Sequence, residues 1–240
     1  FMKIRISLLL ALTLALSGCG QAESTEDTWS DAVRIEFSDD SVTVDGNAAS
    51  ADSAVYTEND IIFYLEGQGV TYGEGTEADA HSQAEADAHT VVHITQPGTY
   101  VLSGELSAGQ IAVDLGEGAE TDPEAVVTLV LDGVDITCTV APAVMFYRVY
   151  ECGSTDGDAA SWEVDTSAAG ANIMIADGTE NTIRGSYVAR IYDPESVTLS
   201  EDGTEVEDAK KLHKYDGAFY SRMSMNVSGG AAGTGVLNIY

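Results

Sequence analysis

The sequence predicts an all-β protein, and more precisely a right-handed parallel β-helix: a single solenoid with three strands per turn. Beyond residue 32, apolar runs of four to six residues end at Gly, Asp or Asn, and no stretch has sustained helical periodicity. These runs also come in groups of three. Stacking one group on the next would bury apolar side chains that a single group leaves uncovered.

The expected strands follow in chain order. Three lead-in strands are expected at 33–38, 41–46 and 60–65. The three complete groups are 90–95, 99–104 and 110–115, then 126–131, 134–138 and 142–147, then 171–175, 180–185 and 217–221. Two further runs, 223–229 and 235–240, begin a fourth group, so the solenoid is predicted to be incomplete at the C-terminus. Short links such as "QPG", "DG" and "ADGT" join the first two runs of each group.

A β-sandwich built from hairpins is the alternative fold. Its strands would alternate polar and apolar residues, because one face of each sheet would meet water. The runs "VVTLVL" (126–131) and "NIMI" (172–175) are more continuously apolar than that. The pattern therefore favours the solenoid.

Residues 1–18 have the composition of a bacterial lipoprotein signal peptide. Lys3 and Arg5 precede an apolar stretch that is shorter than the ~20 residues needed to span a membrane. The tetrapeptide Leu-Ser-Gly-Cys that ends at Cys19 resembles a lipobox, which implies lipidation of Cys19, and an ordinary cleaved signal is the alternative. Residues 19–31 then form a flexible tether and 32–240 the folded domain. We expect an extracellular protein that meets the membrane only through its lipid anchor.

Charge and cysteine content narrow the partners further. The chain has 10 basic and 40 acidic residues and a formal net charge of −30, which excludes nucleic acid as a partner because binding it requires Lys and Arg against phosphates. A hydrophobic content of 44% excludes disorder. Apart from Cys19, the cysteines are Cys138 and Cys152, which form either a disulfide or two free thiols.

Three blocks in order resemble a known family. They are "ITQPGTYVLSGELSAGQIAVDLG" (94–116), "VTLVLDGVDITC…APAV" (127–144) and "IADGTENTI" (175–183). Together they resemble the calcium-associated carbohydrate-binding β-helix family of clostridia and related Gram-positive bacteria, whose fold is similar to that of pectate lyases. The resemblance runs from Val33 to Tyr240. It implies an extracellular protein that binds a plant-type or cell-surface polysaccharide, either polygalacturonate (pectin) or cellulose.

The chain departs from the family pattern in two respects. Met223 and Ser224 stand where the family usually carries an acidic pair. The acidic segments 77–90 and 151–170 look like insertions. The first of them places His81 and His89 among Glu and Asp, as either a transition-metal site or a solvated acidic loop.

Carboxylates gather in pairs at the predicted turns. Ca²⁺ binds six to eight hard oxygen ligands of this kind. We expect calcium as the cofactor, with candidate ligands Asp114, Glu117, Asp132, Asp135, Asp177, Glu180, Asp193 and Glu195. Asp132 and Asp177 each end the first strand of a group and should lie near each other. The alternative for each Asp-Gly pair is a tight turn, in which Asp supplies a local hydrogen bond.

The predicted function is non-catalytic polysaccharide binding, with no catalytic residue assigned. Tyr187, Tyr192 and Tyr215 are candidate platforms for sugar rings. A calcium-dependent polysaccharide lyase is one alternative, and it would need a Lys or Arg base beside the metal. No basic residue lies in a recognised catalytic motif. A structural surface protein without a glycan ligand is the other alternative.

Overall fold

A computed structural model describes residues 29–59, 61, 81, 83–154, 156, 161, 163–186, 201 and 217–240. The chain divides into two units, Phe1–Ser30 and Asp31–Tyr240, and every described strand belongs to the second. The signal peptide, Cys19 and most of the tether lie outside the described residues, as does most of the lead-in run 60–65. Within the described part, no helix has the length and apolarity needed to cross a membrane.

Two sheets contain the described strands. The first holds β1 (Val33–Ser38), β2 (Ser41–Val44), β3 (Asn47–Ala48), β6 (Gly98–Leu106), β8 (Val127–Thr137), β10 (Ala171–Ile175), β11 (Glu180–Arg184), β13 (Met225–Gly229) and β14 (Val236–Ile239). The second holds β4 (Val55–Glu58), β5 (Thr90–Ile94), β7 (Gly109–Asp114), β9 (Val144–Arg148) and β12 (Phe219–Ser221). Three short helices lie between strands: α1 (Gln83–Asp87), and the 3₁₀ helices η2 (Ala119–Thr121) and η4 (Thr166–Ala168).

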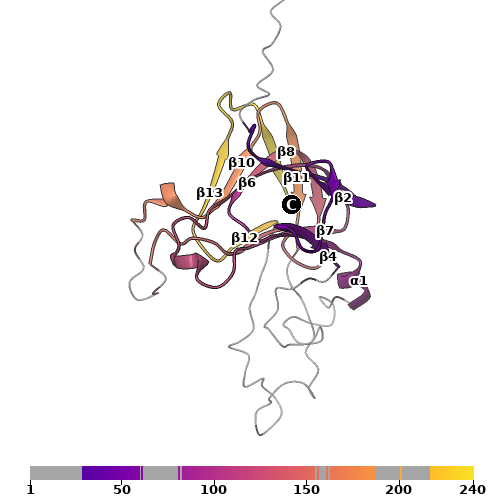
Figure 1. Cartoon of the computed structure of the whole chain (residues 1–240), viewed down its shortest axis with the longest axis horizontal. Coiled ribbons are helices and arrows are strands. Elements are labelled where there is room, and N and C mark those ends of the chain that lie inside the picture. Colours follow the sequence, from indigo (N-terminus) through magenta and orange to yellow (C-terminus); the bar gives the residue numbers. More distant parts are fainter. Residues whose placement is uncertain are drawn as a thin grey trace, which may run out of the picture. The chain divides into compact units, whose positions relative to one another are not determined.

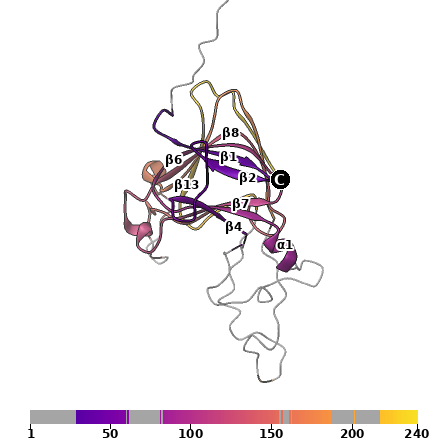
Figure 2. The same ribbon diagram turned by 45° about the vertical axis from the view of Figure 1, so that its right-hand side comes forward.

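The all-β prediction is confirmed, but the parallel β-helix with three strands per turn is wrong. Both sheets are mixed: β1–β2, β2–β3 and β4–β5 pair antiparallel, and the other described pairs are parallel. The two sheets face each other across the core in a sandwich-like arrangement, with β13, β10, β6 and β8 on one side and β12, β7 and β4 on the other (Figures 1 and 2). The sandwich alternative is therefore closer, although the antiparallel pairs among the described strands all lie in the N-terminal part of the domain, from β1 to β5.

One long strand explains why the expected grouping fails. The runs 126–131 and 134–138 were expected as two strands around a "DG" turn, but both belong to β8. Gly133 adopts a φ of +81°, and the pairing of β6 with β8 shifts register at this level. Asp132 and Gly133 therefore bend a continuous strand instead of reversing it. The first half of β8 pairs with β10 and its second half with β11.

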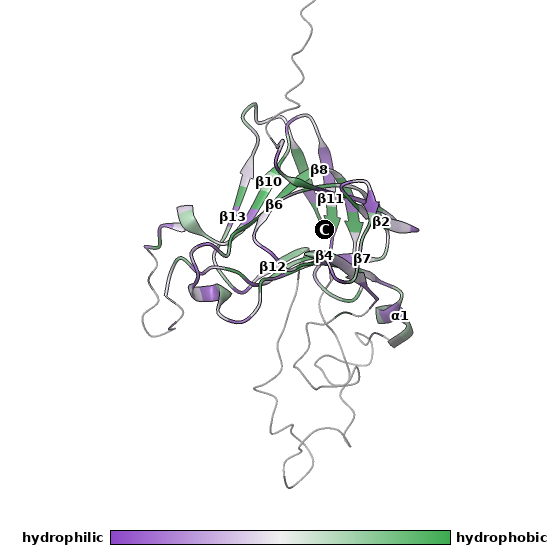
Figure 3. Ribbon diagram, in the orientation of Figure 1, coloured by the Kyte–Doolittle hydropathy of each residue, from purple (hydrophilic) through white to green (hydrophobic). Residues whose placement is uncertain are grey.

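Apolar side chains in matched register fill the space between the sheets. In the first sheet Leu102 lies opposite Leu131, and in the second Val113 lies opposite Phe146; all four are 0% exposed. Fully burying one such side chain stabilises the fold by roughly 1.5–3 kcal/mol. Val130 points to the other face of β8 and is buried as well. Both faces of this part of β8 are therefore buried, which explains why the run 126–131 is so apolar (Figure 3).

Asn181 holds the bend of β8 in place. Its side chain is 0% exposed and its Oδ1 accepts the backbone N–H groups of Gly133 (2.9 Å) and Val134 (3.0 Å). Its Nδ2 donates to Thr179 Oγ1 (2.8 Å) and to the carbonyl oxygen of Val236 (3.1 Å). One buried amide therefore joins the bend of β8 to β11 and to the start of β14.

Asn181→Ala should destabilise the domain by about 1–3 kcal/mol, because it removes the acceptor of the buried Val134 N–H and of the more exposed Gly133 N–H. Asn238→Ala is the matched control, since the amide of Asn238 makes one bond of 3.1 Å to the exposed Glu180. The free energy of unfolding of both variants, measured in urea, checks this. Equal losses for the two would show that the bend does not depend on Asn181.

Candidate functional site

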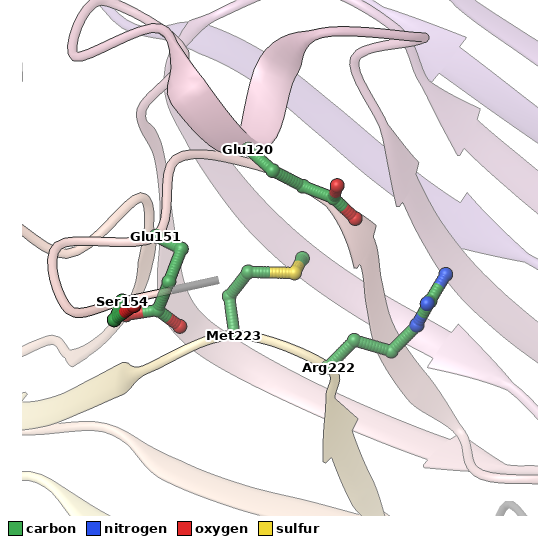
Figure 4. Close-up of a pocket in the computed structure, with 5 residues that line it drawn as sticks. All are labelled: Glu120, Glu151, Ser154, Arg222 and Met223. Carbon is green, nitrogen blue, oxygen red and sulfur yellow. The ribbon is translucent and has the colours of Figure 1, made fainter. Parts of the chain in front are cut away.

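A polar cleft of about 230 Å³ opens where three loops of the chain meet. Its lining residues are Glu120, Glu151, Ser154, Arg222 and Met223 (Figure 4). Glu120 lies on η2, Glu151 and Ser154 follow β9, and Arg222 and Met223 follow β12. The cleft is assembled from segments about a hundred residues apart because β9 and β12 are neighbours in the second sheet.

Glu151 ties two of these loops together. Its Oε1 accepts the N–H of Gly153 (2.7 Å) and the hydroxyl of Ser224 (2.9 Å), and its Oε2 accepts the N–H of Ser224 (2.8 Å). Burial by itself would raise the pKa of Glu151, but these donors together outweigh it and hold the pKa below its ordinary value. Glu151 is thus a charged residue, here called a charged pin, whose hydrogen bonds hold the segment after β9 against the segment after β12.

Glu120 and Arg222 are the two charged groups of the cleft that keep bonding capacity. The main chain fixes η2 beside Glu151, whose N–H donates to the carbonyl oxygen of Glu120 (3.0 Å). Within the described part of the chain, neither the Glu120 carboxylate nor the Arg222 guanidinium makes a hydrogen bond or an ion pair. The Arg222 guanidinium lies over the ring of Tyr147, 5.1 Å from its centroid. Met223, 8% exposed, lies between the side chains of Glu151 and Arg222, below Glu120 in the view of Figure 4.

Two of the predicted calcium ligands are instead partners of arginines. Asp114 accepts Nε and Nη2 of Arg148, both at 2.6 Å, and also the N–H of Gly116 (3.0 Å). The hydrogen bonds that Arg148 donates to Asp114 raise the pKa of Arg148 above its ordinary value. Asp135 accepts Nη1 of Arg184 at 2.5 Å, in an exposed pair. The negative charge of each of these two carboxylates is thus already balanced by a guanidinium group.

Asp177 and Glu180 serve the loop before β14. Asp177 accepts the N–H groups of Ala232 (2.8 Å) and Thr234 (3.0 Å), and these backbone bonds lower its pKa. Glu180 accepts from the amide of Asn238. The segments that carry Asp132 and Asp177 are neighbours, since β8 and β10 pair in register up to Leu131 and Ile175. Asp177 is therefore an acceptor for a distant loop, which neither the calcium interpretation nor the local-turn interpretation describes.

The described carboxylates do not fit a calcium site. Among the residues that the structure describes, no three Asp, Glu, His or Cys side chains gather as a metal site, and Glu117 and Asp132 are exposed. Asp193 and Glu195 lie outside the described residues, as do the candidate sugar platforms Tyr187, Tyr192 and Tyr215. Calcium and the tyrosine platforms stay predictions.

The remaining candidate metal and thiol residues have structural surroundings. His89 is 2% exposed, donates from Nδ1 to the carbonyl oxygen of Glu85 (2.8 Å) and accepts the N–H of Thr139 at Nε2 (3.1 Å). Both ring nitrogens are thus in use. Cys138 and Cys152 are free thiols, and burial raises the pKa of Cys138 to about 11. A thiol with so high a pKa stays protonated and unreactive.

The fold and the cleft define an all-β protein with a polar, charge-lined recess. The chain belongs to the family described as carbohydrate-binding domain-containing protein, which matches residues 88–240 and so includes all five cleft residues.

Two similar proteins carry related descriptions. A carbohydrate-binding domain-containing protein of Acetivibrio thermocellus is 25% identical over 197 residues, covering 80% of this chain and 48% of the relative. The chain thus spans about half the length of this curated relative. A solved structure described as the polysaccharide lyase-like protein from C. thermocellum, in a gadolinium derivative, is 22% identical and covers 82% of this chain and 49% of that chain, with a TM-score of 0.39. That score is too low for the two folds to be equated.

The lowered pKa of Glu151 predicts a pH-dependent contribution to stability. Because the pKa is lower in the folded state, the contribution is complete above the ordinary value of 4.5 and disappears as the pH falls through the folded pKa. Glu151→Gln should therefore cost about 1–2 kcal/mol at pH 7, since an amide cannot accept all three bonds, and much less at the acidic end.

Urea unfolding of the wild-type and Glu151→Gln chains between pH 3 and 7 checks this. Glu105→Gln, on the exposed part of β6, removes the same charge without removing a hydrogen bond and serves as the control. A difference between wild type and Glu151→Gln that stays constant over this pH range would contradict the assignment of Glu151 as a charged pin.

Proposed function

We propose that the chain is a non-catalytic binding protein for polysaccharide, of the polygalacturonate (pectin) or cellulose type. The observation that carries the proposal is the cleft, in which a carboxylate acceptor on Glu120 and a guanidinium donor on Arg222 lack partners among the described residues. Sugars present hydroxyl groups that both donate and accept hydrogen bonds, so one group of each kind suits them. Membership of a carbohydrate-binding family supports the same conclusion.

Two further elements of the proposal concern residues outside the described part. Lipidation of Cys19 would hold the domain at the outer face of a bacterial cell membrane, where polysaccharide is accessible. Calcium would assist through Asp193 and Glu195. Of the described candidate ligands, some are already bonded to arginines or to backbone N–H groups, and the others do not gather in a group of three. A calcium ion with open coordination positions would accept uronate oxygens and so offset the repulsion between a polyanion and this acidic chain.

Arg148 and Arg184 do not favour a lyase. Its base must lose a proton near neutral pH, which requires a lowered pKa. The pKa of Arg148 is instead raised by Asp114, and Arg184 is paired with Asp135. Neither residue lines the cleft.

The purified chain should be retarded by polysaccharide in affinity electrophoresis without releasing product. Gels containing polygalacturonate or hydroxyethylcellulose, run with calcium and with chelator, measure retention. Absorbance of an unsaturated uronate, followed in parallel, measures cleavage. We expect retention on at least one polymer, loss of polygalacturonate retention in chelator, and no rise in absorbance.

Each arm tests a separate element of the proposal. Rising absorbance would establish the lyase instead. Polygalacturonate retention that survives chelator would exclude calcium bridging. Absence of retention on every glycan would favour a structural surface protein, and metal analysis of the chain purified without chelator would then show whether calcium is bound at all.

A further inference from the structure

The charges that line the cleft do not balance. Glu120 and Glu151 contribute two carboxylates, and Arg222 contributes one guanidinium. Glu151 is ionised near neutral pH, because the donors around it lower its pKa. The lining therefore has an excess of one negative charge, in a chain whose formal net charge is −30.

The three charged groups have different capacities to meet a ligand. Both oxygens of Glu151 already accept hydrogen bonds from Gly153 and Ser224, so Glu151 contributes charge and position more than new bonds. The Glu120 carboxylate can accept from two hydroxyl groups, and Arg222 can donate to two oxygens. The Ser154 hydroxyl also lines the cleft, but it already donates to the carbonyl oxygen of Asp156 (3.3 Å) and accepts the N–H of Asp156 (3.1 Å).

The size and floor of the cleft suit a single sugar ring. About 230 Å³ is below the range of roughly 300–1,000 Å³ that is usual for drug-sized ligands, so one ring of a longer chain is the fitting occupant. The side chain of Met223 lies between Glu151 and Arg222, on the side of the cleft opposite Glu120 in the view of Figure 4. Its thioether is an adaptable apolar surface against which the C–H face of a sugar ring can pack.

We propose that this cleft is a subsite for one neutral, hydroxyl-rich sugar unit of a polysaccharide, and that Glu120 is the residue that selects it over a uronate. Glu120 accepts from hydroxyl groups of the sugar, Arg222 donates to its oxygens, and Met223 packs against the ring. This inference rests on the proposed function and chooses, for this cleft, the neutral class among the candidate glycans.

A uronate at this position would meet like charges. Its carboxylate could pair with Arg222, but Glu120 and Glu151 line the same small recess, within the ~8–10 Å over which charges interact at ordinary ionic strength. The guanidinium is also engaged with the face of Tyr147. A neutral ring forms the same hydroxyl bonds without this repulsion. Calcium does not change the comparison here, because the described residues of the cleft supply two carboxylates, and both oxygens of Glu151 already accept hydrogen bonds.

Calorimetric titration of the chain with cellohexaose and with hexagalacturonate, both in chelator, tests the proposal. We expect the wild type to bind cellohexaose more tightly. Glu120→Ala should weaken cellohexaose binding about tenfold, because the acceptor is lost. Glu120→Gln keeps hydrogen-bonding atoms and removes the charge, so it should change cellohexaose affinity by less than about threefold and strengthen hexagalacturonate binding about threefold.

Two further variants complete the test. Glu124→Gln is the charge control, since Glu124 is exposed, four residues further along the chain, and does not line the cleft. It should leave both affinities unchanged. Arg222→Gln should weaken cellohexaose binding to a similar extent as Glu120→Ala. Thermal unfolding confirms that each variant is folded before its affinities are compared.

The outcomes separate this inference from the proposed function. Retention on glycan gels together with unchanged cellohexaose affinity in Glu120→Ala and Arg222→Gln would overturn the subsite and leave polysaccharide binding intact. Tighter binding of hexagalacturonate by the wild type in chelator, reduced in Arg222→Gln, would reverse the selectivity. No binding of any glycan by the wild type would remove the proposed function itself.

Discussion

The bend of β8 is the constraint on which the first sheet depends. At Gly133 and Val134 the strand leaves the regular ladder, and two backbone N–H groups, of which that of Val134 is buried, need acceptors. Asn181 supplies one oxygen for both and uses its amide nitrogen to hold the chain before β14. β8 remains continuous through the bend, so the bend fixes its first half relative to its second half. The first half pairs in register with β10, and β10 pairs in register with β13. Ser224 immediately precedes β13, so the register also determines where Ser224 meets Glu151 and, with it, one wall of the cleft.

Strand positions could be predicted from the sequence because each strand is a short apolar run. The runs 90–95 and 171–175 correspond closely to β5 and β10, and the absence of helical periodicity correctly predicted the all-β class. The strand count per repeat could not be predicted from "DG" alone. Asp-Gly between apolar residues favours a tight turn, but here it is a bend, because the acceptor for its N–H groups comes from Asn181, 48 residues away. A local pattern does not contain that partner.

The same limit explains the candidate site. Acidic residues at turns were predicted as calcium ligands, and yet Asp114 is paired with Arg148, 34 residues further on, and Asp177 with backbone N–H groups of the loop around Ala232. The residues that line the cleft come from three loops without a common motif, so neither Glu120 nor Arg222 was predicted. The one local signal was the replacement of an acidic pair by Met223 and Ser224. In the structure Met223 is part of the lining and Ser224 is the partner of Glu151.

The carboxylates of this acidic chain are of two kinds: those whose charge is stabilised by a partner within the fold, and those without such a partner among the described residues. Asp114 and Asp135 face guanidinium groups, and Asp177 and Glu151 face backbone N–H groups, which stabilise the charge and lower the pKa. Such groups hold the fold together and have little left to offer a ligand. Glu120 differs, since no described residue bonds its carboxylate and the guanidinium of Arg222 lines the same cleft. Ligand binding by this protein is therefore expected where compensation within the fold is incomplete, and not where acidic residues are most numerous.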